Sequence, residues 1–236
     1  MVNHHLEQMA QAITKSWFVD FEPWDGDMPD DWEAITLGDL CDTVTKGTTP
    51  TTLKKQFVMQ GINFVKAESI LDDHSLVFSK LAFIDDETNT LLSRSVIREN
   101  DIIFTIAGTL GRFAFVGKDL LPANTNQAVA IIRSDTSKIN PITLYSFFVG
   151  GLHMDFYTKN IQQAVQANLS LTTIKALPLL LPPPKKLAEY STLIEPLFEQ
   201  VFQHYAENRR LVTLRDTILP RLMSGELSIL GIDHDK

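Results

Sequence analysis

The chain has 236 residues, of which 44% are hydrophobic, enough to bury the core of one domain and to carry an appendage. It contains a single cysteine, which excludes a disulfide framework or a cysteine-based zinc site built from this chain alone. No secretory apolar region is recognisable and no apolar run approaches the ~20 residues that cross a bilayer. We therefore expect a soluble, cytoplasmic protein.

The net charge of −8 is unevenly distributed along the chain. Residues 20–39 hold eight acidic side chains and no lysine or arginine, which equals the whole imbalance. Residues 41–185 hold 14 lysines and arginines against 12 acids. Because phosphate binding needs local rather than overall positive charge, a nucleic-acid partner remains possible.

The N-terminal segment predicts a short helix. Apolar residues at Leu6, Met9, Ile13 and Trp17 share one face of a helix of about three turns. Such a helix is marginal alone in water, so we expect it to pack on another element, most simply a long C-terminal helix. The acidic stretch with Pro and Gly that continues to Asp31 is typical of a linker. Residues 1–31 thus form a helix and an acidic linker.

Residues 32–184 predict a globular, mixed α+β domain without βαβ alternation. Residues 46–52 form a polar loop with Gly and Pro, and residues 107–111 form a turn. A buried helix is expected at residues 141–157, followed by a stretch rich in Gln and Asn from 162 to 170. Strands are predicted at residues 62–65, 76–78, 96–97, 102–106, 113–116 and 128–132.

The clearest periodicity in the chain follows the prolines at 182–184. It predicts one long helix over residues 187–222 within a segment, 185–225, for dimerisation and partner docking, with 226–236 as a tail. An ordinary amphipathic helix is the alternative to a coiled coil. Pro220 is expected to bend or end the helix, and Ser224-Gly225 to cap it. The positions with the alternating three- and four-residue spacing of a coiled coil are Ile194, Leu197, Val201, His204, Asn208, Leu211, Arg215, Ile218 and Leu222.

The sequence offers little support for catalysis. It has no P-loop, no Gly-x-Ser-x-Gly, no His-Glu-x-x-His and nothing that marks Cys41 as a nucleophile. Asp101, Glu99 and Glu68 could bind Mg²⁺ as in a nuclease, but no Glu-x-Lys follows an acidic strand in a suitable context. We therefore expect no catalytic or metal site in this chain, and a divalent-metal nuclease is the least favoured alternative.

Polar side chains on loops predict DNA binding instead. Each one alone is better explained as a solvated or turn-forming residue, and the prediction depends on the whole cluster. Side chains suited to phosphates or guanines are Lys46, Thr48, Thr49, Lys54, Lys55, Lys66 and Arg112. Amides suited to adenine edges are Asn124, Asn126, Gln127, Gln162, Gln163, Gln166 and Asn168.

Several motifs occur in a specific order over most of the chain. They are Trp32 to Leu40, Lys46-Gly47-Thr48-Thr49-Pro50, Asp101 to Thr105, Gly108-Thr109-Leu110-Gly111, Asn126-Gln127-Ala128-Val129, Asn168-Leu169-Ser170, Leu177 to Pro183 and Leu211 to Leu227. In this order they resemble the specificity (S) subunits of type I restriction-modification systems, here in a half-length form with one target recognition domain.

The resemblance implies recognition of double-stranded DNA without catalysis. The helix would dock on a methyltransferase (M) subunit that supplies S-adenosylmethionine, and a restriction (R) subunit, where present, would use ATP and Mg²⁺. This chain would hold no cofactor. A non-DNA-binding assembly protein that dimerises through its C-terminal helix is the alternative from a different functional class.

The length departs from the family pattern, in which two recognition domains are joined by two helices. This sequence has one domain and one complete helix, and residues 6–21 resemble the end of a preceding helix. A natural half-subunit, a split-gene product and a fragment all fit this pattern. A half-subunit would form a homodimer and read a bipartite inverted repeat. The sequence does not predict the DNA target or its spacer.

Overall fold

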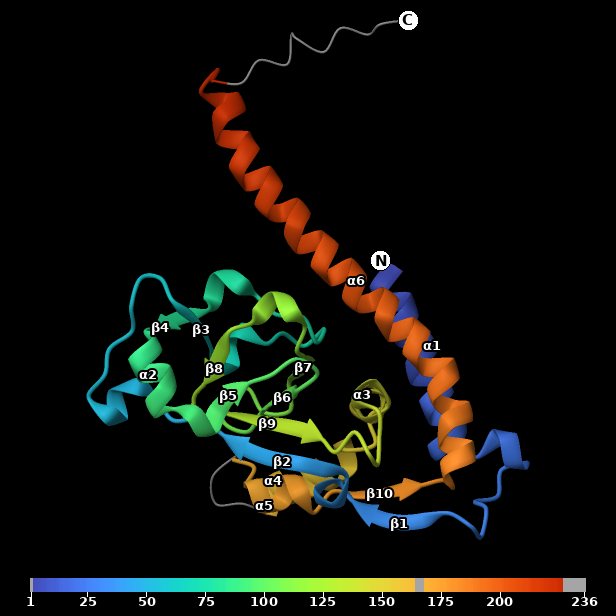
Figure 1. Ribbon diagram of the computed structural model, residues 1–236. Coiled ribbons are helices and arrows are strands. Elements are labelled where there is room, and N and C mark those ends of the chain that lie inside the picture. The colour runs from blue at the N-terminus through green and yellow to red at the C-terminus, as the bar shows by residue number, and fades with distance from the viewer. Residues whose placement is uncertain (1, 164–167, 227–236) are drawn as a thin grey trace, which may run out of the picture.

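The computed structural model describes residues 2–163 and 168–226, in which a globular head carries a long projecting helix (Figure 1). The fold class is mixed α and β with one long helix, as predicted. Two four-stranded sheets build the head. The first, antiparallel sheet has the order β2 (Cys41–Lys46), β9 (Val129–Ser134), β6 (Ile102–Thr105) and β7 (Phe113–Phe115).

The second sheet is mixed, because β3 and β8 run parallel while its other pairs are antiparallel. Its order is β4 (Ala82–Ile84), β3 (Ile62–Val65), β8 (Ala123–Thr125) and β5 (Val96–Ile97), with helix α2 (Asp86–Leu91) after β4. A separate antiparallel pair joins β1 (Glu33–Thr36) to β10 (Pro178–Leu181). This pair joins the first and the last strand of the head, so the chain enters and leaves the head at the same place.

The first sheet is buried on both faces, which explains why its central strands are apolar without alternation. On β6, Ile102 and Phe104 belong to one hydrophobic cluster, while Ile103 belongs to another on the opposite face. On β9, Ile132 and Ile131 divide in the same way. Three helices complete the head, namely α3 (Pro141–Val149), α4 (Met154–Gln163) and α5 (Leu171–Lys175).

The single buried helix expected over residues 141–157 is wrong, because α3 ends at Val149 and α4 begins at Met154. The break falls at two glycines. A Cβ on Gly150 would lie 2.3 Å from the Thr14 side chain, and Gly151 has a φ of +78°. The first glycine therefore permits close packing of the N-terminal helix, and the second permits the left-handed turn.

Helix α1 (Val2–Phe18) lies antiparallel along α6 (Pro184–Met223), which confirms the predicted packing of the two terminal helices. The Asn3 amide donates to the Val201 carbonyl at 3.3 Å near one end. The Thr14 and Tyr190 hydroxyls lie 2.7 Å apart near the other end. The pairing ends where α1 begins, and α6 continues beyond it.

Residues 19–31, which follow α1, are packed against neighbouring aromatic side chains. Trp24 packs edge-on against Trp17 and Trp32, with ring centroids 5.2 and 5.1 Å away, and Phe21 also packs on Trp32. The aromatic side chains between the acids supply enough apolar area to fold this stretch against the helices.

The strand expected at residues 76–78 is wrong. Residues 76–78 form no strand; Leu76 makes an isolated bridge with Ile70, and Phe78–Lys80 is a 3-10 helix. Pro220 does not end α6, which continues to Met223 before the predicted cap at Ser224-Gly225. Within residues 2–163 and 168–226, no helix is long and apolar enough to cross a membrane.

Candidate nucleic-acid interface

The antiparallel register of the first sheet gathers polar loops along one of its edges. β2 and β6 end at this edge, whereas β9 and β7 begin there, as shown by the pairing of Lys46 with Ala130 and of Thr105 with Val129. The loops after β2, before β9 and after β6 are consequently neighbours. We call this edge, with the loop at residues 168–170, the polar edge.

The loop after β2 presses directly on the segment before β9. The Gly47 amide donates to the Asn126 carbonyl at 3.0 Å. A Cβ on Gly47 would lie only 1.8 Å from the Thr125 carbonyl oxygen, so only glycine fits. The Thr49 amide donates to Gln127 Oε1 at 3.1 Å. Two groups of predicted site residues that are far apart in sequence thus form one surface.

Gln127 lies at the centre of the polar edge with an exposed side chain. Its Oε1 accepts hydrogen bonds from both the amide and the hydroxyl of Thr49. The two lone pairs of this oxygen are occupied, so the group available to a ligand is the Nε2 donor. This arrangement suits a single contact to a base acceptor better than the bidentate adenine pairing expected from the sequence.

The second sheet brings Lys66 to the same edge. β3 runs parallel to β8, with Val65 opposite Thr125, and the Thr125 hydroxyl donates to the Val65 carbonyl at 2.9 Å. Lys66 follows immediately. Its ammonium lies 5.1 Å from the Phe57 ring centroid and 3.8 Å from Glu68.

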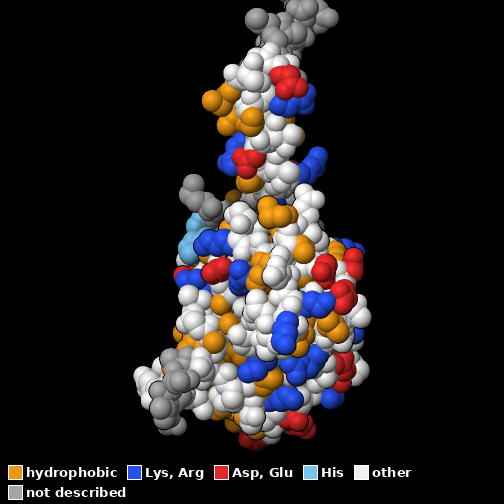
Figure 2. Space-filling view, turned by 90° about the vertical axis from the view of Figure 1, so that its left-hand side faces the viewer, with side chains coloured by type: hydrophobic (Ala, Val, Ile, Leu, Met, Phe, Trp, Pro, Cys, Tyr) orange, Lys and Arg blue, Asp and Glu red, His pale blue; other side chains and the backbone are white. Residues whose placement is uncertain are grey.

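Basic side chains concentrate near these loops. Figure 2 shows Lys and Arg gathered on the lower part of the head, with acidic side chains at the margin. Lys46 and Lys54 are exposed and make no ion pair with other described residues, whereas Lys55 pairs with Glu87 at 2.6 Å. Arg94 was missed by sequence reasoning, although its guanidinium donates to the Thr48 hydroxyl at 3.4 Å. No local pattern marks Arg94, because only the fold places it beside Thr48.

The Gln- and Asn-rich stretch reaches the polar edge at its end. The Leu169 amide donates to the Ile106 carbonyl at 3.0 Å, and the Ile106 amide donates to the Ala128 carbonyl at 2.8 Å. Ile106 thus connects Leu169 to Ala128 by backbone hydrogen bonds, and exposed Asn168, which precedes Leu169, lies near Gln127, which precedes Ala128. Gln162 is exposed near the end of α4. The side chain of Gln163 and the whole of Gln166 lie outside the described part of the chain.

Three candidate side chains make hydrogen bonds or ion pairs with other groups of the protein instead of facing a ligand. Asn124 is fully buried, and its amide bonds to Ser95 and Asn89 at 2.7 and 2.8 Å. Arg112 makes a bidentate ion pair with Asp72 at 2.7 and 2.8 Å. The Asn126 side-chain oxygen accepts from the amide two residues later at 3.0 Å, a turn-forming contact.

The acids considered for Mg²⁺ are dispersed or paired. Asp101 is fully buried and receives both Arg133 Nε and Nη2, at 2.8 and 2.7 Å. Burial raises the pKa of Asp101, while Arg133 lowers it. No cluster of three or more metal-ligating residues occurs among the described residues. Burial also raises the pKa of Cys41 to about 12, which keeps this thiol neutral.

The predicted seam of α6 divides into two parts. Ile194 and Val201 are buried, and His204 Nδ1 lies 2.8 Å from Asn3 Oδ1 of α1. Beyond Arg209, residues 210–223 project from the head, and we call them the distal segment (Figure 1). Leu211, Leu214 and Leu219 are each 50% exposed there. Asn208 and Arg215 are also exposed, whereas Leu197, Ile218 and Leu222 are half-buried.

Comparisons with known proteins agree on one family. Residues 29–200 match the model described as the type I restriction modification DNA specificity domain. The type I restriction enzyme MjaIX specificity subunit of Methanocaldococcus jannaschii is 25% identical over 96% of this chain and 54% of its own length. The HindI specificity subunit of Haemophilus influenzae is 24% identical over 96% of this chain and 62% of its own length.

A solved structure shows the same fold. The S subunit of a type I restriction-modification system from M. genitalium has a TM-score of 0.60 at 15% identity, over 94% of this chain and 54% of its own. The chain thus spans little more than half the length of these relatives.

Proposed function

The chain belongs to the type I restriction modification DNA specificity family, and from that premise we propose that it is a DNA sequence-recognition subunit. In this role it directs a methyltransferase, and where present a restriction subunit, to a bipartite DNA site. The chain itself is non-catalytic. S-adenosylmethionine belongs to the methyltransferase, ATP and Mg²⁺ belong to the restriction subunit, and the complex acts in the cytoplasm.

The polar edge is the observation that carries this proposal. It brings hydroxyl, amide and basic groups from segments 78 residues apart, such as Thr49 and Gln127, onto one exposed surface. Exposed cations suit phosphate oxygens, which fix the register of a protein on the duplex. The Nε2 donor of Gln127 suits an acceptor such as guanine O6 or N7 in the major groove.

The distal segment supports the pairing of two such heads. Three of its apolar side chains, Leu211, Ile218 and Leu222, form a stripe along one face of a helix that no other described element covers. Two copies related by a two-fold axis would cover each other's stripe, and each distal segment would then continue the line of the partner's α1. Such a dimer presents two identical heads and reads an inverted repeat.

Selection from a pool of randomised duplexes, with the partner methyltransferase present, tests DNA reading. We expect one half-site sequence to be enriched. Gln127→Ala should weaken binding to that sequence by about tenfold, matching a discrimination of about 1–3 kcal/mol per base contact. Lys46→Ala should weaken binding to all sequences and reduce the salt slope by about one. Gln200→Ala, an exposed amide on α6, is the control.

Failure to enrich any sequence would overturn the proposal. A chain that dimerises through its helix yet binds no DNA at low salt would favour the assembly-protein alternative.

Light scattering tests the dimer. We expect a mass twice that of one chain, and a single-chain mass for the double variant Leu211→Glu, Ile218→Glu. Leu193→Glu introduces the same charge at a leucine that is 48% exposed elsewhere on α6, and should leave the dimer intact. A wild-type chain that remains monomeric at all concentrations would refute the paired arrangement.

A further inference from the structure

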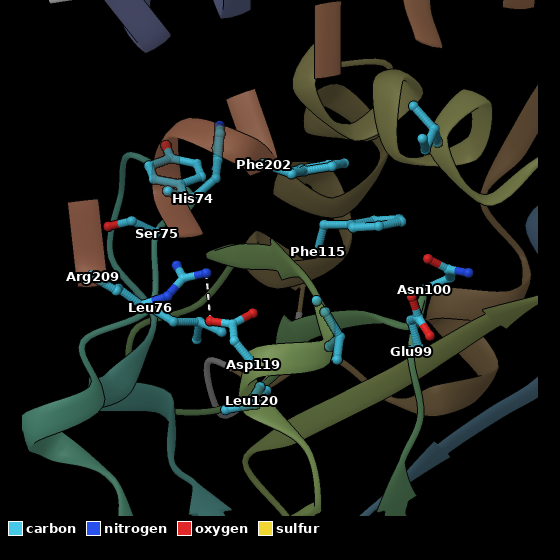
Figure 3. A pocket seen from close by; sticks show the side chains of 14 residues that line it. His74, Ser75, Leu76, Glu99, Asn100, Phe115, Asp119, Leu120, Phe202 and Arg209 are labelled. Carbon is cyan, nitrogen blue, oxygen red and sulfur yellow. Dashed lines mark ion pairs between the residues drawn. The ribbon is translucent and has the colours of Figure 1, made fainter. Parts of the chain in front are cut away.

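The joint between α6 and the head contains polar contacts and a cavity. Aromatic stacking holds the helix up to Phe202, whose ring lies parallel to that of Phe115 with centroids 4.5 Å apart. Beyond this stack lies a cavity of about 210 Å³, lined by the loop at residues 74–76, the end of β7 and α6 (Figure 3). The aromatic packing between α6 and the head therefore ends at Phe202, about two turns before Arg209.

Arg209 closes this joint by an ion pair. Its Nη2 meets the Asp119 carboxylate across the cavity (Figure 3). Asp119 belongs to the 3-10 helix Lys118–Leu120, between β7 and β8. The two side chains are only 29% and 37% exposed, so solvent screens them less than a surface pair.

Arg209 also contacts a second loop of the head. Its guanidinium carbon lies 5.1 Å from the ring centroid of Phe78, at the start of another 3-10 helix. The planar guanidinium thus binds a carboxylate and an aromatic face at once, a geometry that lysine reproduces only in part. One turn earlier, the Tyr205 hydroxyl lies 3.0 Å from the Asp73 carbonyl and 3.1 Å from the Glu7 carboxyl of α1.

Within the described part of the chain, Arg209 is the last residue of α6 that makes an ion pair or a ring contact with the head. Past it the two surfaces separate, leaving an open groove of about 800 Å³ between residues 75–79 and the helix as far as Asp216. The direction in which the distal segment leaves the head is therefore fixed at Arg209 and Tyr205.

This direction has a calculable effect on spacing. Residues 209–223 span about 21 Å at the α-helical rise. A rotation of roughly 10° about Arg209 would move the tip by about 4 Å relative to the head, comparable to the base-pair rise of about 3.4 Å. A joint that is loose by this angle would no longer distinguish half-site spacings that differ by one base pair.

We propose that Arg209, held by Asp119 and Phe78, is a positioning residue that sets the angle between head and helix and thereby the spacer length between the two half-sites. The inference depends on the proposed function, since it requires two heads on one duplex. Arg209 itself touches no DNA. Its removal should leave half-site reading and dimer formation intact while broadening the range of spacers that the protein accepts.

The test uses the full chain and duplexes that carry the selected half-site twice, as an inverted repeat with spacers of four to ten base pairs. For the wild type, we expect one spacer to bind at least tenfold better than its neighbours. Arg209→Ala should reduce this ratio at least threefold, while its affinity for a duplex with one half-site changes less than twofold. Asp119→Asn should act in the same direction.

Matched variants separate positioning from loss of folding. Arg209→Lys keeps the ion pair and should restore most of the spacer preference. Arg210→Ala removes the neighbouring guanidinium, which is 80% exposed and pairs with Glu207 on the same helix, and should behave as the wild type. If Arg209→Ala unfolds the chain, Asp119→Asn and Phe78→Leu provide the same measurement.

The possible failures are distinguishable. If the wild type enriches no half-site, the proposed function fails. If it reads the half-site but Arg209→Ala and Asp119→Asn keep the wild-type spacer preference, only the positioning role is overturned. A wild type that reads the half-site but shows no spacer preference would also overturn only the positioning role.

Discussion

His153 should make the stability of this protein depend on pH, and replacing it tests how the core is packed. Its ring is 3% exposed, and both ring nitrogens lack a hydrogen-bond partner among the described residues. Four aromatic rings surround it, those of Phe104, Phe113, Phe148 and Tyr157, at centroid distances of 5.2 to 5.9 Å. Burial, together with a smaller effect of nearby His74, lowers the pKa of His153 from 6.5 to about 4.

Proton linkage gives the direction in which the stability changes with pH. Between pH 6.5 and 4 the unfolded chain binds a proton at His153 that the folded chain excludes, so stability falls as the pH falls. From pH 7.5 to pH 5 the pKa difference corresponds to a loss of about 2 kcal/mol from this residue. His153→Leu keeps an apolar side chain of similar volume and removes the loss.

Urea unfolding followed by tryptophan fluorescence, at pH 5, 6 and 7.5, measures the effect. We expect the variant to gain about 2 kcal/mol on the wild type between pH 7.5 and pH 5. His5→Gln, at an exposed position of α1, is the control. A stability difference between His153→Leu and the wild type that stays constant over this pH range would show that His153 is not excluded from protonation in the folded state.

Three further predictions concern other buried contacts. Burial raises the pKa of Glu7 from 4.5 to about 7, so stability falls as the pH rises from 4.5 through 7, and urea unfolding should show a flatter profile for Glu7→Gln. Gly47→Ala should lower the free energy of unfolding by about 2 kcal/mol, measured by urea unfolding, because its Cβ would lie 1.8 Å from a carbonyl oxygen; an unchanged value would contradict this close approach. Arg133→Ala should lower it by about 3–5 kcal/mol at pH 7, since it leaves Asp101 buried without its partner. Arg98→Ala, at an exposed neighbour, should lower it by less than about 0.5 kcal/mol.

Features governed by neighbouring residues could be predicted from the sequence. The apolar runs of β6 and β9 and the long 3-4 spacing of α6 appear where their periodicity placed them. A strand or helix period repeats within a few residues, so the local chain carries enough information. The failures fell where the tertiary structure overrode the pattern, as at Gly150, which allows Thr14 to pack closely, and at Gly151, whose left-handed turn separates α3 from α4.

The candidate site shows the same division. The sequence supplied the polar loops, and their closeness at the polar edge follows from strand register. It did not indicate that Asn124 is committed to Ser95, or that Arg112 is committed to Asp72, 40 residues away. It also missed Arg94, which reaches Thr48 over 46 residues. Hydrogen-bond partners at such separations depend on how the sheets pack.

The amino-acid sequence alone specifies an α+β head, a long helix and the order of motifs that resembles a DNA specificity subunit. Which polar groups remain available to a ligand, and which half of α6 is already covered, depend on the tertiary structure. It also decided that the helix leaves the head at Arg209. Periodicity is a property of the local chain, whereas burial and pairing arise only when distant segments compete for the same space and the same hydrogen-bond partners.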